Sequence, residues 1–227
     1  MDYQRLRESS EWQGIRSLTA NLRQFNPLNL KRDDAAKAFW INLYNAMIID
    51  AITELGIRST VWEVPLVFSR VAYDVGGHIL TADMIEHGIL RANARPPYPL
   101  SGPYFAPGSS QLVLALGRLD PRIHFALVCG SKRCPPIGFY EETGLDTQLS
   151  MATRAFINAE TVVDSGTKLV TTSSIFKYYA DDFGGMPSGL SRFLASWLDN
   201  AKTAEWLREH AHSARFEFRR YDWSLNR

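Results

Sequence analysis

The chain has 227 residues, enough for one sizeable hydrophobic core, and its two cysteines are too few for a disulfide framework. Apolar residues make up 45% of it, which excludes wholesale disorder, and the net charge of +1 gives no reason to expect a nucleic-acid partner. No segment has the apolar length of a membrane span or the pattern of a signal peptide, so we expect a cytoplasmic protein with reduced thiols.

The first third of the chain is predicted to be mainly helical. Residues 2–24 carry apolar side chains at roughly helical spacing until Asn26-Pro27 breaks the pattern, which predicts one or two amphipathic helices packed on the main body. Residues 33–56 form the clearest helix, which begins with two aspartates and stops at Gly56. Because this helix is apolar on nearly all sides, we expect it to be central and buried on several faces.

A short hairpin and a long irregular segment are expected next. Residues 70–80 hold two β-prone runs around a Gly-Gly pair, which is typical of a hairpin turn. Thr81 can cap a helix over residues 82–92. Residues 93–110 are rich in proline and predict an irregular segment, and long segments of this kind are often functional.

The rest of the chain alternates short helices with β-prone runs. Residues 122–128 predict a buried strand, and residues 161–172 predict a second hairpin. The other predicted elements are helices at 111–119, 141–158, 173–185 and 188–209, followed by a strand-like tail from residue 214. Because helices outnumber strands, we expect an α+β fold: a single helix-rich domain with a small, mostly antiparallel sheet built from short hairpins.

Both cysteines lie within RIHFALVCGSKRCPPIGFY. Cys129 ends the predicted strand, where the amides of Gly130 and Ser131 could bind an oxyanion. Cys134 precedes two prolines, which fix the backbone as extended. A catalytic thiol, a redox pair and two buried structural thiols all remain open, although the C-x4-C spacing differs from that of thioredoxin-type sites.

Histidines and a carboxylate could complete a thiol site. A cysteine hydrolase needs a histidine base and a group that orients it. His78 follows the predicted turn and His87 lies next to Glu86, so either imidazole could be the base or a structural residue. His124 lies in the predicted buried strand, which favours a hydrogen-bonded core histidine. The spacings typical of zinc sites are missing, so we expect no metal and no cofactor.

Two asparagines interrupt the most apolar helix. Asn42 and Asn45 are three positions apart and therefore share a face. Buried amides must find partners or cost about 1–3 kcal/mol each. They could tie the helix to the backbone of a neighbouring loop, orient a catalytic histidine or line a binding pocket, and the first interpretation is favoured.

Five segments in this order carry a family resemblance: AFWINLYNAMIIDAI (38–52), GGHILTADMIEHGILR (76–91), DPRIHFALVCGSKRCPPI (120–137), SSIFKYYADDFG (173–184) and RYDWSLN (220–226). With them the chain resembles the DUF547 family, a domain of unknown function. The resemblance implies a DUF547-like domain at 30–227, preceded by a helical extension at 1–29. It implies no settled activity, but some members are fused to glutaredoxin-like or DEP domains, which suggests intracellular thiol chemistry or signalling.

Three functions follow as hypotheses. The first is a thiol-dependent enzyme, a cysteine hydrolase or an acyl or peptidyl transferase, that acts on a peptide or a small thiol or acyl substrate. Its nucleophile would be Cys129 or Cys134, its base His78 or His87, with Glu86 or an asparagine as the orienting group. The second is a binding or scaffold module with a protein partner. The third is a thiol redox protein, which requires the two cysteines to lie close enough to bridge.

Overall fold

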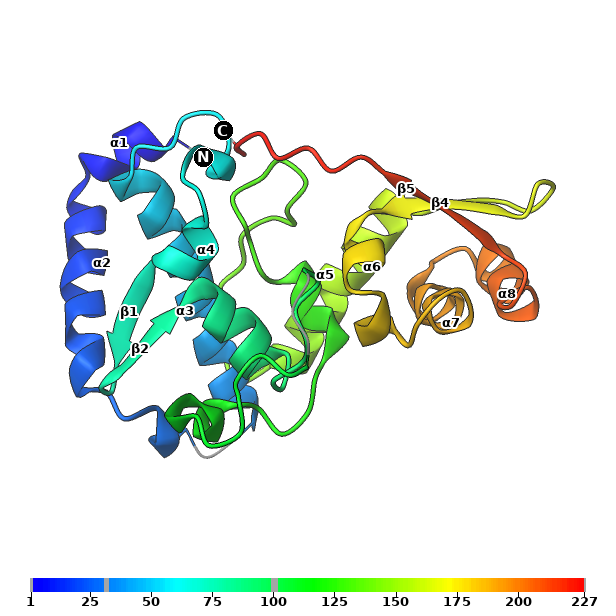
Figure 1. Cartoon of the computed structure of the whole chain (residues 1–227). Coiled ribbons are helices and arrows are strands. Elements are labelled where there is room, and N and C mark those ends of the chain that lie inside the picture. Colours follow the sequence, from blue (N-terminus) through cyan, green and yellow to red (C-terminus); the bar gives the residue numbers. More distant parts are fainter. Residues whose placement is uncertain (1, 31–32, 99–101, 227) are drawn as a thin grey trace. The chain divides into compact units, whose positions relative to one another are not determined.

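The protein is described here by a computed structural model that covers residues 2–30, 33–98 and 102–226. The chain divides into two compact units. Unit 1 comprises Met1–Leu119, Ala126–Leu145 and Asp222–Arg227, and unit 2 comprises Asp120–Phe125 and Asp146–Tyr221. The fold is α+β, as predicted: it is rich in helices and has two small sheets built mostly from antiparallel hairpins (Figure 1).

Unit 1 is built around the long helix α3 (Asp33–Glu54). Buried side chains occur on most of its faces, as expected for a central helix, and Gly56 follows it with a φ of +62°. The other helical segments described in unit 1 are α1 (Tyr3–Arg7), α2 (Ser10–Asn21), η1 (Leu22–Gln24), η2 (Pro27–Asn29), η3 (Val61–Glu63), α4 (Val67–Arg70), η4 (Met84–Leu90) and η5 (Ser110–Leu114).

The segment before α3 packs against it. Trp12 of α2 is 2% exposed, and its indole Nε1 donates to Glu54 Oε1 on α3 at 3.1 Å. Figure 1 shows α1 and α2 in dark blue beside α3. The one or two helices predicted within residues 2–24 are present as α1 and α2, while the separate helical extension at 1–29 stays a prediction.

The first hairpin and the segment after it also agree with the predicted order. Strands β1 (Ala72–Val75) and β2 (His78–Thr81) pair antiparallel around the Gly-Gly turn. The hydroxyl of Thr81 then accepts a hydrogen bond from the amide of Met84 at 3.2 Å, so it caps the next turn as expected. The helix that begins there, however, is the π-helix η4 rather than an ordinary α-helix.

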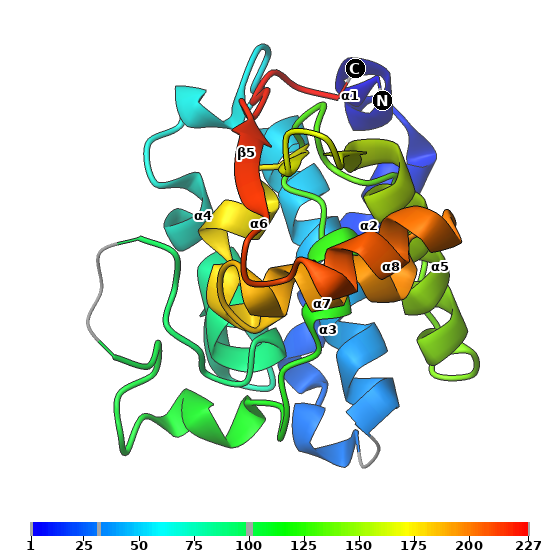
Figure 2. The same ribbon diagram turned by 90° about the vertical axis from the view of Figure 1, so that its right-hand side faces the viewer.

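Unit 2 combines a mixed three-stranded sheet with short helices. Strand β4 (Leu169–Ser173) pairs antiparallel with β3 (Val162–Asp164) and parallel with β5 (Arg215–Arg219). The helices are α5 (Leu145–Glu160), α6 (Ile175–Tyr178), α7 (Ser188–Trp197) and α8 (Ala201–Glu209), with η6 (Pro121–Phe125) and η7 (Ala180–Phe183). Figure 2 shows α7 and α8 side by side.

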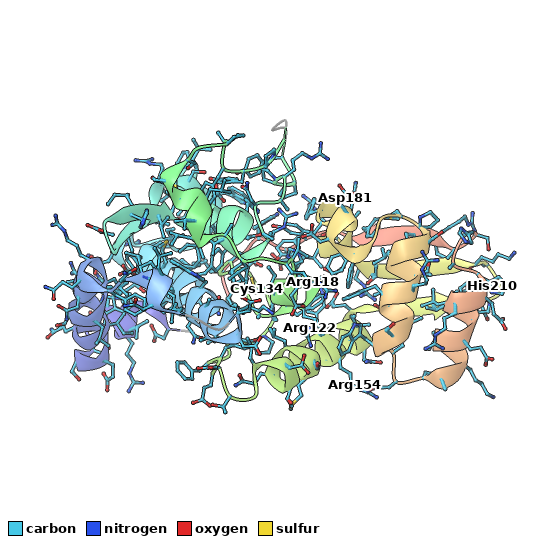
Figure 3. The ribbon with its side chains drawn as sticks, turned by 90° about the horizontal axis from the view of Figure 1, so that it is seen from below. Arg118, Arg122, Cys134, Arg154, Asp181 and His210 are labelled. Carbon is cyan, nitrogen blue, oxygen red and sulfur yellow. The ribbon has the colours of Figure 1, made fainter. Side chains whose placement is uncertain are left out.

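Phenylalanines form the core of unit 2. Phe125, Phe176 and Phe183 are nearly or completely buried and pack against one another, with ring centroids 4.9–6.0 Å apart. The guanidinium of Arg122 of η6, labelled in Figure 3, contacts Asp120 at 2.9 Å and Asp146 of α5 at 2.7 Å. The predicted helix at 141–158 and hairpin at 161–172 are both present, with shifted ends.

The predicted strand at residues 122–128 is wrong. Residues 121–125 form the 3-10 helix η6, Ala126 lies in a turn, and residues 127–129 belong to no helix or strand. The burial that suggested a strand is real, because Ala126 and Val128 are at most 1% exposed. Their backbone hydrogen bonds go to the side chain of Asn45 instead of a neighbouring strand.

Within the described residues, no helix is both long enough and apolar enough to cross a membrane.

Candidate thiol site and its surroundings

The two thiols lie side by side. Figure 3 labels Cys134. The Sγ atoms of Cys129 and Cys134 are 2.9 Å apart, and the cysteines are not joined by a disulfide. Ser131 Oγ lies 3.5 Å from Cys129 Sγ and 3.4 Å from Cys134 Sγ. Both cysteines are half-buried, so the structure gathers three of the predicted site residues into one partly accessible cluster.

A backbone amide of the loop donates a hydrogen bond to the sulfur of Cys134. The amide of Cys129 donates to Cys134 Sγ at 3.0 Å, and the amide of Cys134 donates to the carbonyl of Ser131 at 3.1 Å, which closes a tight turn. Gly130 makes the approach possible because its φ is +84°, a conformation that favours glycine. A β-carbon at this position would lie 2.4 Å from Ile52 Cδ1 on α3.

The segment 222–226 lies along the same loop. The amide of Lys132 donates to the carbonyl of Ser224 at 2.8 Å, and the amide of Asn226 donates to the carbonyl of Gly130 at 3.0 Å. Asn226 Oδ1 in turn accepts from the hydroxyl of Tyr3 at 2.6 Å. The prediction missed these residues, because nothing in their local pattern links them to a loop about a hundred positions away.

Glu86 and His87 belong to a second polar cluster, on the π-helix η4. Glu86 Oε2 accepts from the Tyr44 hydroxyl of α3 at 3.0 Å. His87 Nδ1 lies 3.1 Å from Arg91 Nη1, and His87 Nε2 lies 3.9 Å from Asp83 Oδ1. Asp83, Glu86, His87 and Arg91 are all buried, although the prediction named only two of them.

The backbone hydrogen bonds of η4 span five positions, as in a π-helix. The amide of Arg91 donates to the carbonyl of Glu86, five positions earlier, and the amide of Asn93 donates to the carbonyl of Gly88. Gly88 admits the ring of Phe105, because a β-carbon there would lie 2.2 Å from a ring carbon. Asn93 also holds both backbone groups of Phe105. Isolated π-helical turns occur frequently at functional sites.

Burial and neighbouring groups shift the pKa of Asp83 in the second cluster. Burial raises the pKa of Asp83 to about 6, partly opposed by a hydrogen bond from Ser69, and the nearby Glu86 raises it further. A guanidinium can only donate, so His87 Nδ1 accepts from Arg91 and the proton of a neutral His87 sits on Nε2. Tyr98, from the proline-rich segment, lies with its ring 5.8 Å from that of His87.

Both asparagines of α3 hold the backbone of other segments. Asn42 Nδ2 donates to the carbonyl of Tyr140 at 2.7 Å, and its Oδ1 accepts from the amide of Tyr140 at 3.0 Å. Asn45 bonds in the same way to Ala126 and Val128, at 3.0 and 2.9 Å. These contacts support the interpretation that the asparagines tie α3 to neighbouring loops.

The two remaining histidines have separate environments. His78 is half-buried at the start of β2, opposite Val75, and its side chain makes no hydrogen bond or ion pair with the other described residues. His124 is buried in unit 2, where its Nε2 lies 2.7 Å from Asp182 Oδ2 and its ring lies 4.0 Å from that of Tyr179. His124 is therefore a hydrogen-bonded core residue, as predicted.

Comparison with known proteins identifies the family. The described residues contain no group of three or more histidine, cysteine or acidic side chains arranged to hold a metal ion. What they define is an α+β protein with a contacting thiol pair. A family model described as "Protein of unknown function, DUF547" matches residues 27–157, more than half of the chain, and the chain belongs to this family. Neither the curated proteins nor the solved structures gave a match.

The region matched by the family model includes most of the residues described above. It contains the cysteine loop, the asparagines of α3 and the polar cluster on η4. Tyr3 and Asn226 lie outside it, as do two of the five segments that suggested the resemblance.

Proposed function

We propose that the protein catalyses thiol–disulfide exchange, with Cys134 as the attacking thiolate and Cys129 as the resolving thiol. The observation that carries this proposal is the distance of 2.9 Å between the two sulfur atoms. A disulfide needs about 2.05 Å, so the two sulfur atoms must approach by less than about 1 Å. Of the three functions considered, thiol redox chemistry is the one that requires this closeness.

The contacts assign the roles. Cys134 Sγ receives the amide hydrogen of Cys129 at 3.0 Å and has the thiol of Cys129 and the hydroxyl of Ser131 within reach. Hydrogen bonds to a charged group favour its charged form, so these donors stabilise a thiolate on Cys134. The thiolate is the reactive form of cysteine, which makes Cys134 the first nucleophile.

The reaction then proceeds in two exchanges. The Cys134 thiolate attacks one sulfur of a small disulfide, forms a mixed disulfide and releases the other half as a thiolate, which takes up a proton. The thiol of Cys129 loses its proton and attacks Cys134 Sγ. This step forms the Cys129–Cys134 bond and releases the second thiol. The substrate gains two electrons and two protons: the protein supplies both electrons and the proton of Cys129, and the solvent supplies the second proton. A small thiol restores the dithiol by the reverse exchanges.

Mass spectrometry after treatment with oxidised glutathione tests the proposal. The unaltered protein should lose two hydrogen atoms and show a Cys129–Cys134 linkage that dithiothreitol reverses. Cys129→Ser should stop at a glutathione adduct on Cys134, while Cys134→Ser should react slowly. Two thiols that never bridge, or an adduct that forms first on Cys129, would contradict the proposal and favour the binding-module alternative.

A second candidate is cysteine-dependent hydrolysis or acyl transfer. The amide-bonded sulfur of Cys134 favours it too, since acyl transfer needs a thiolate but no second thiol. An activated ester should then leave an acyl group on Cys134 even in Cys129→Ser. The base would have to be His78 or His87. Because Nδ1 of His87 is engaged by Arg91, we place thiol–disulfide exchange first.

A further inference from the structure

The segment 222–226 is held between two loops of unit 1. On one side the amide of Leu225 donates to the carbonyl of Ser59 at 2.8 Å. On the other side Ser131 and Leu225 form an antiparallel bridge, flanked by hydrogen bonds from Lys132 to Ser224 and from Asn226 to Gly130. The cysteine loop therefore has a backbone partner along the residues that separate Cys129 from Cys134.

A pair of side chains anchors this segment to helix α1. The hydroxyl of Tyr3 donates to Asn226 Oδ1 at 2.6 Å, and the amide of Asn226 donates to the carbonyl of Gly130 at 3.0 Å. Tyr3 is 8% exposed, so this hydrogen bond is largely protected from water. Figures 1 and 2 both show α1 next to the red end of the ribbon. An unbroken chain of contacts thus leads from Tyr3 to the backbone beside Cys129.

The Tyr3 hydroxyl also lies near the thiols. Burial raises its pKa to about 12, and the charges that Cys134 and Cys129 carry as thiolates contribute to this rise. The hydroxyl therefore keeps its proton throughout the pH range in which cysteine thiolates form, near pH 8.5 in model peptides. It can hold Asn226 in place whichever protonation state the thiols adopt.

We propose that Tyr3 and Asn226 are positioning residues of the thiol pair. By fixing segment 222–226 on the cysteine loop, they hold the loop in the conformation that directs the Cys129 amide at Cys134 Sγ. The inference rests on the proposed thiol function and assigns it two residues outside the region matched by the family. In this role both residues act through the backbone of Gly130.

The pH dependence of thiol alkylation tests the proposal. The rate at which iodoacetamide modifies Cys134 is measured across pH by peptide mass spectrometry, in the full chain and in Tyr3→Phe and Asn226→Ala. The midpoint of the profile reports the thiol pKa, whereas easier access raises only the plateau. Loss of the amide contact should raise the midpoint by about one pH unit in each variant. The double variant should show the same rise, because both residues act through one hydrogen bond.

Tyr73→Phe is the matched control. It also removes a tyrosine hydroxyl bonded in unit 1, to Asp50 Oδ2 at 2.7 Å, but away from the loop, and its midpoint should not move. Asn226→Ala keeps the ring of Tyr3 in place, so the proposal can still be tested if Tyr3→Phe folds poorly.

Each outcome has a separate meaning. A low midpoint in the unaltered protein that stays unchanged in both variants would overturn the positioning role alone. An equal rise in Tyr73→Phe would also overturn it, because the effect would then be general. An ordinary midpoint in the unaltered protein, together with no disulfide after oxidation, would overturn the proposed function and this inference with it.

Discussion

Asn45 of α3 accepts a hydrogen bond from the backbone amide of Val128 at 2.9 Å, although 83 positions separate them in the chain. The same side chain donates to the carbonyl of Ala126 at 3.0 Å. One amide group thus offers the segment before Cys129 the donor and acceptor that a neighbouring strand would otherwise supply. All three residues are buried, so these hydrogen bonds have no easy replacement by water.

We expect Asn45→Leu to destabilise the protein by about 2–4 kcal/mol. The substitution keeps the volume but leaves a buried carbonyl and a buried amide without partners, at about 1–3 kcal/mol each. Urea denaturation of the variant and the unaltered protein measures the difference. Asn158→Leu is the control, because Asn158 makes the same two kinds of backbone bond to Trp197 and Asp199 at a half-buried site. An equal or larger loss in the control would contradict this account.

In unit 2, we likewise expect that breaking the buried His124–Asp182 pair costs more stability than breaking an exposed ion pair. Both side chains are at most 4% exposed, and their atoms are 2.7 Å apart. Asp182→Ala leaves a buried imidazole without this partner and should lower the free energy of unfolding by about 2–4 kcal/mol. Asp199→Ala, which breaks an ion pair with Arg154 at an exposed site, should change it by less than about 1 kcal/mol. Thermal unfolding of both variants provides the comparison, and similar losses would refute the prediction.

Asp83 makes stability depend on pH. Burial raises its pKa from 3.8 to about 6, so between about pH 4 and pH 6 the native carboxyl holds a proton that the unfolded one has released. Stability from this group is therefore greatest at about pH 4 and falls as the pH rises to about 6, by up to about 3 kcal/mol. Asp83→Asn should remove this slope, which denaturation at a series of pH values would show.

A second variant tests the sign. The hydrogen bond from Ser69 lowers the pKa of Asp83, so Ser69→Ala should raise that pKa further and steepen the loss of stability with pH. The buried neighbours Glu86 and His87 are unchanged in both variants. An identical pH slope in all three proteins would show that Asp83 does not control it.

Local patterns predicted most elements correctly and failed where distant contacts decide. The apolar spacing of α3 and the glycine turns of both hairpins are local signals, and these elements are present. The apolar run at 122–128 correctly indicated burial, but an asparagine far away in the chain satisfies its backbone, so no strand forms. Within the π-helix, Gly88 packs against the ring of Phe105, a contact that no local pattern reveals.

The candidate site shows the same division. Cys129, Gly130, Ser131 and Cys134 could be grouped from the sequence because they are neighbours in the chain. Their geometry could not, since the distance between the sulfur atoms depends on the turn between them. Tyr3 and Asn226 reach the loop only through tertiary contacts.

The close contact between Gly130 and helix α3 can be tested by substitution. Gly130→Ala should lower the free energy of unfolding by about 2–4 kcal/mol, for two reasons. A φ of +84° disfavours any side chain, and the new methyl group would lie 2.4 Å from the buried Ile52 Cδ1. Gly144→Ala is the control for the first reason alone, because Gly144 has a φ of +91° and open space around it, and it should lose only about 1 kcal/mol.

Ile52→Val separates the two contributions, since valine lacks the one methyl group in the way. The double variant with Gly130→Ala should be more stable than the sum of the single effects predicts, by about 1 kcal/mol or more. Strictly additive losses would mean that the clash is relieved by movement of the loop. In that case Gly130→Ala should also move the Cys129 amide away from Cys134 Sγ, and the rate of disulfide formation between the cysteines would fall even where the protein remains folded.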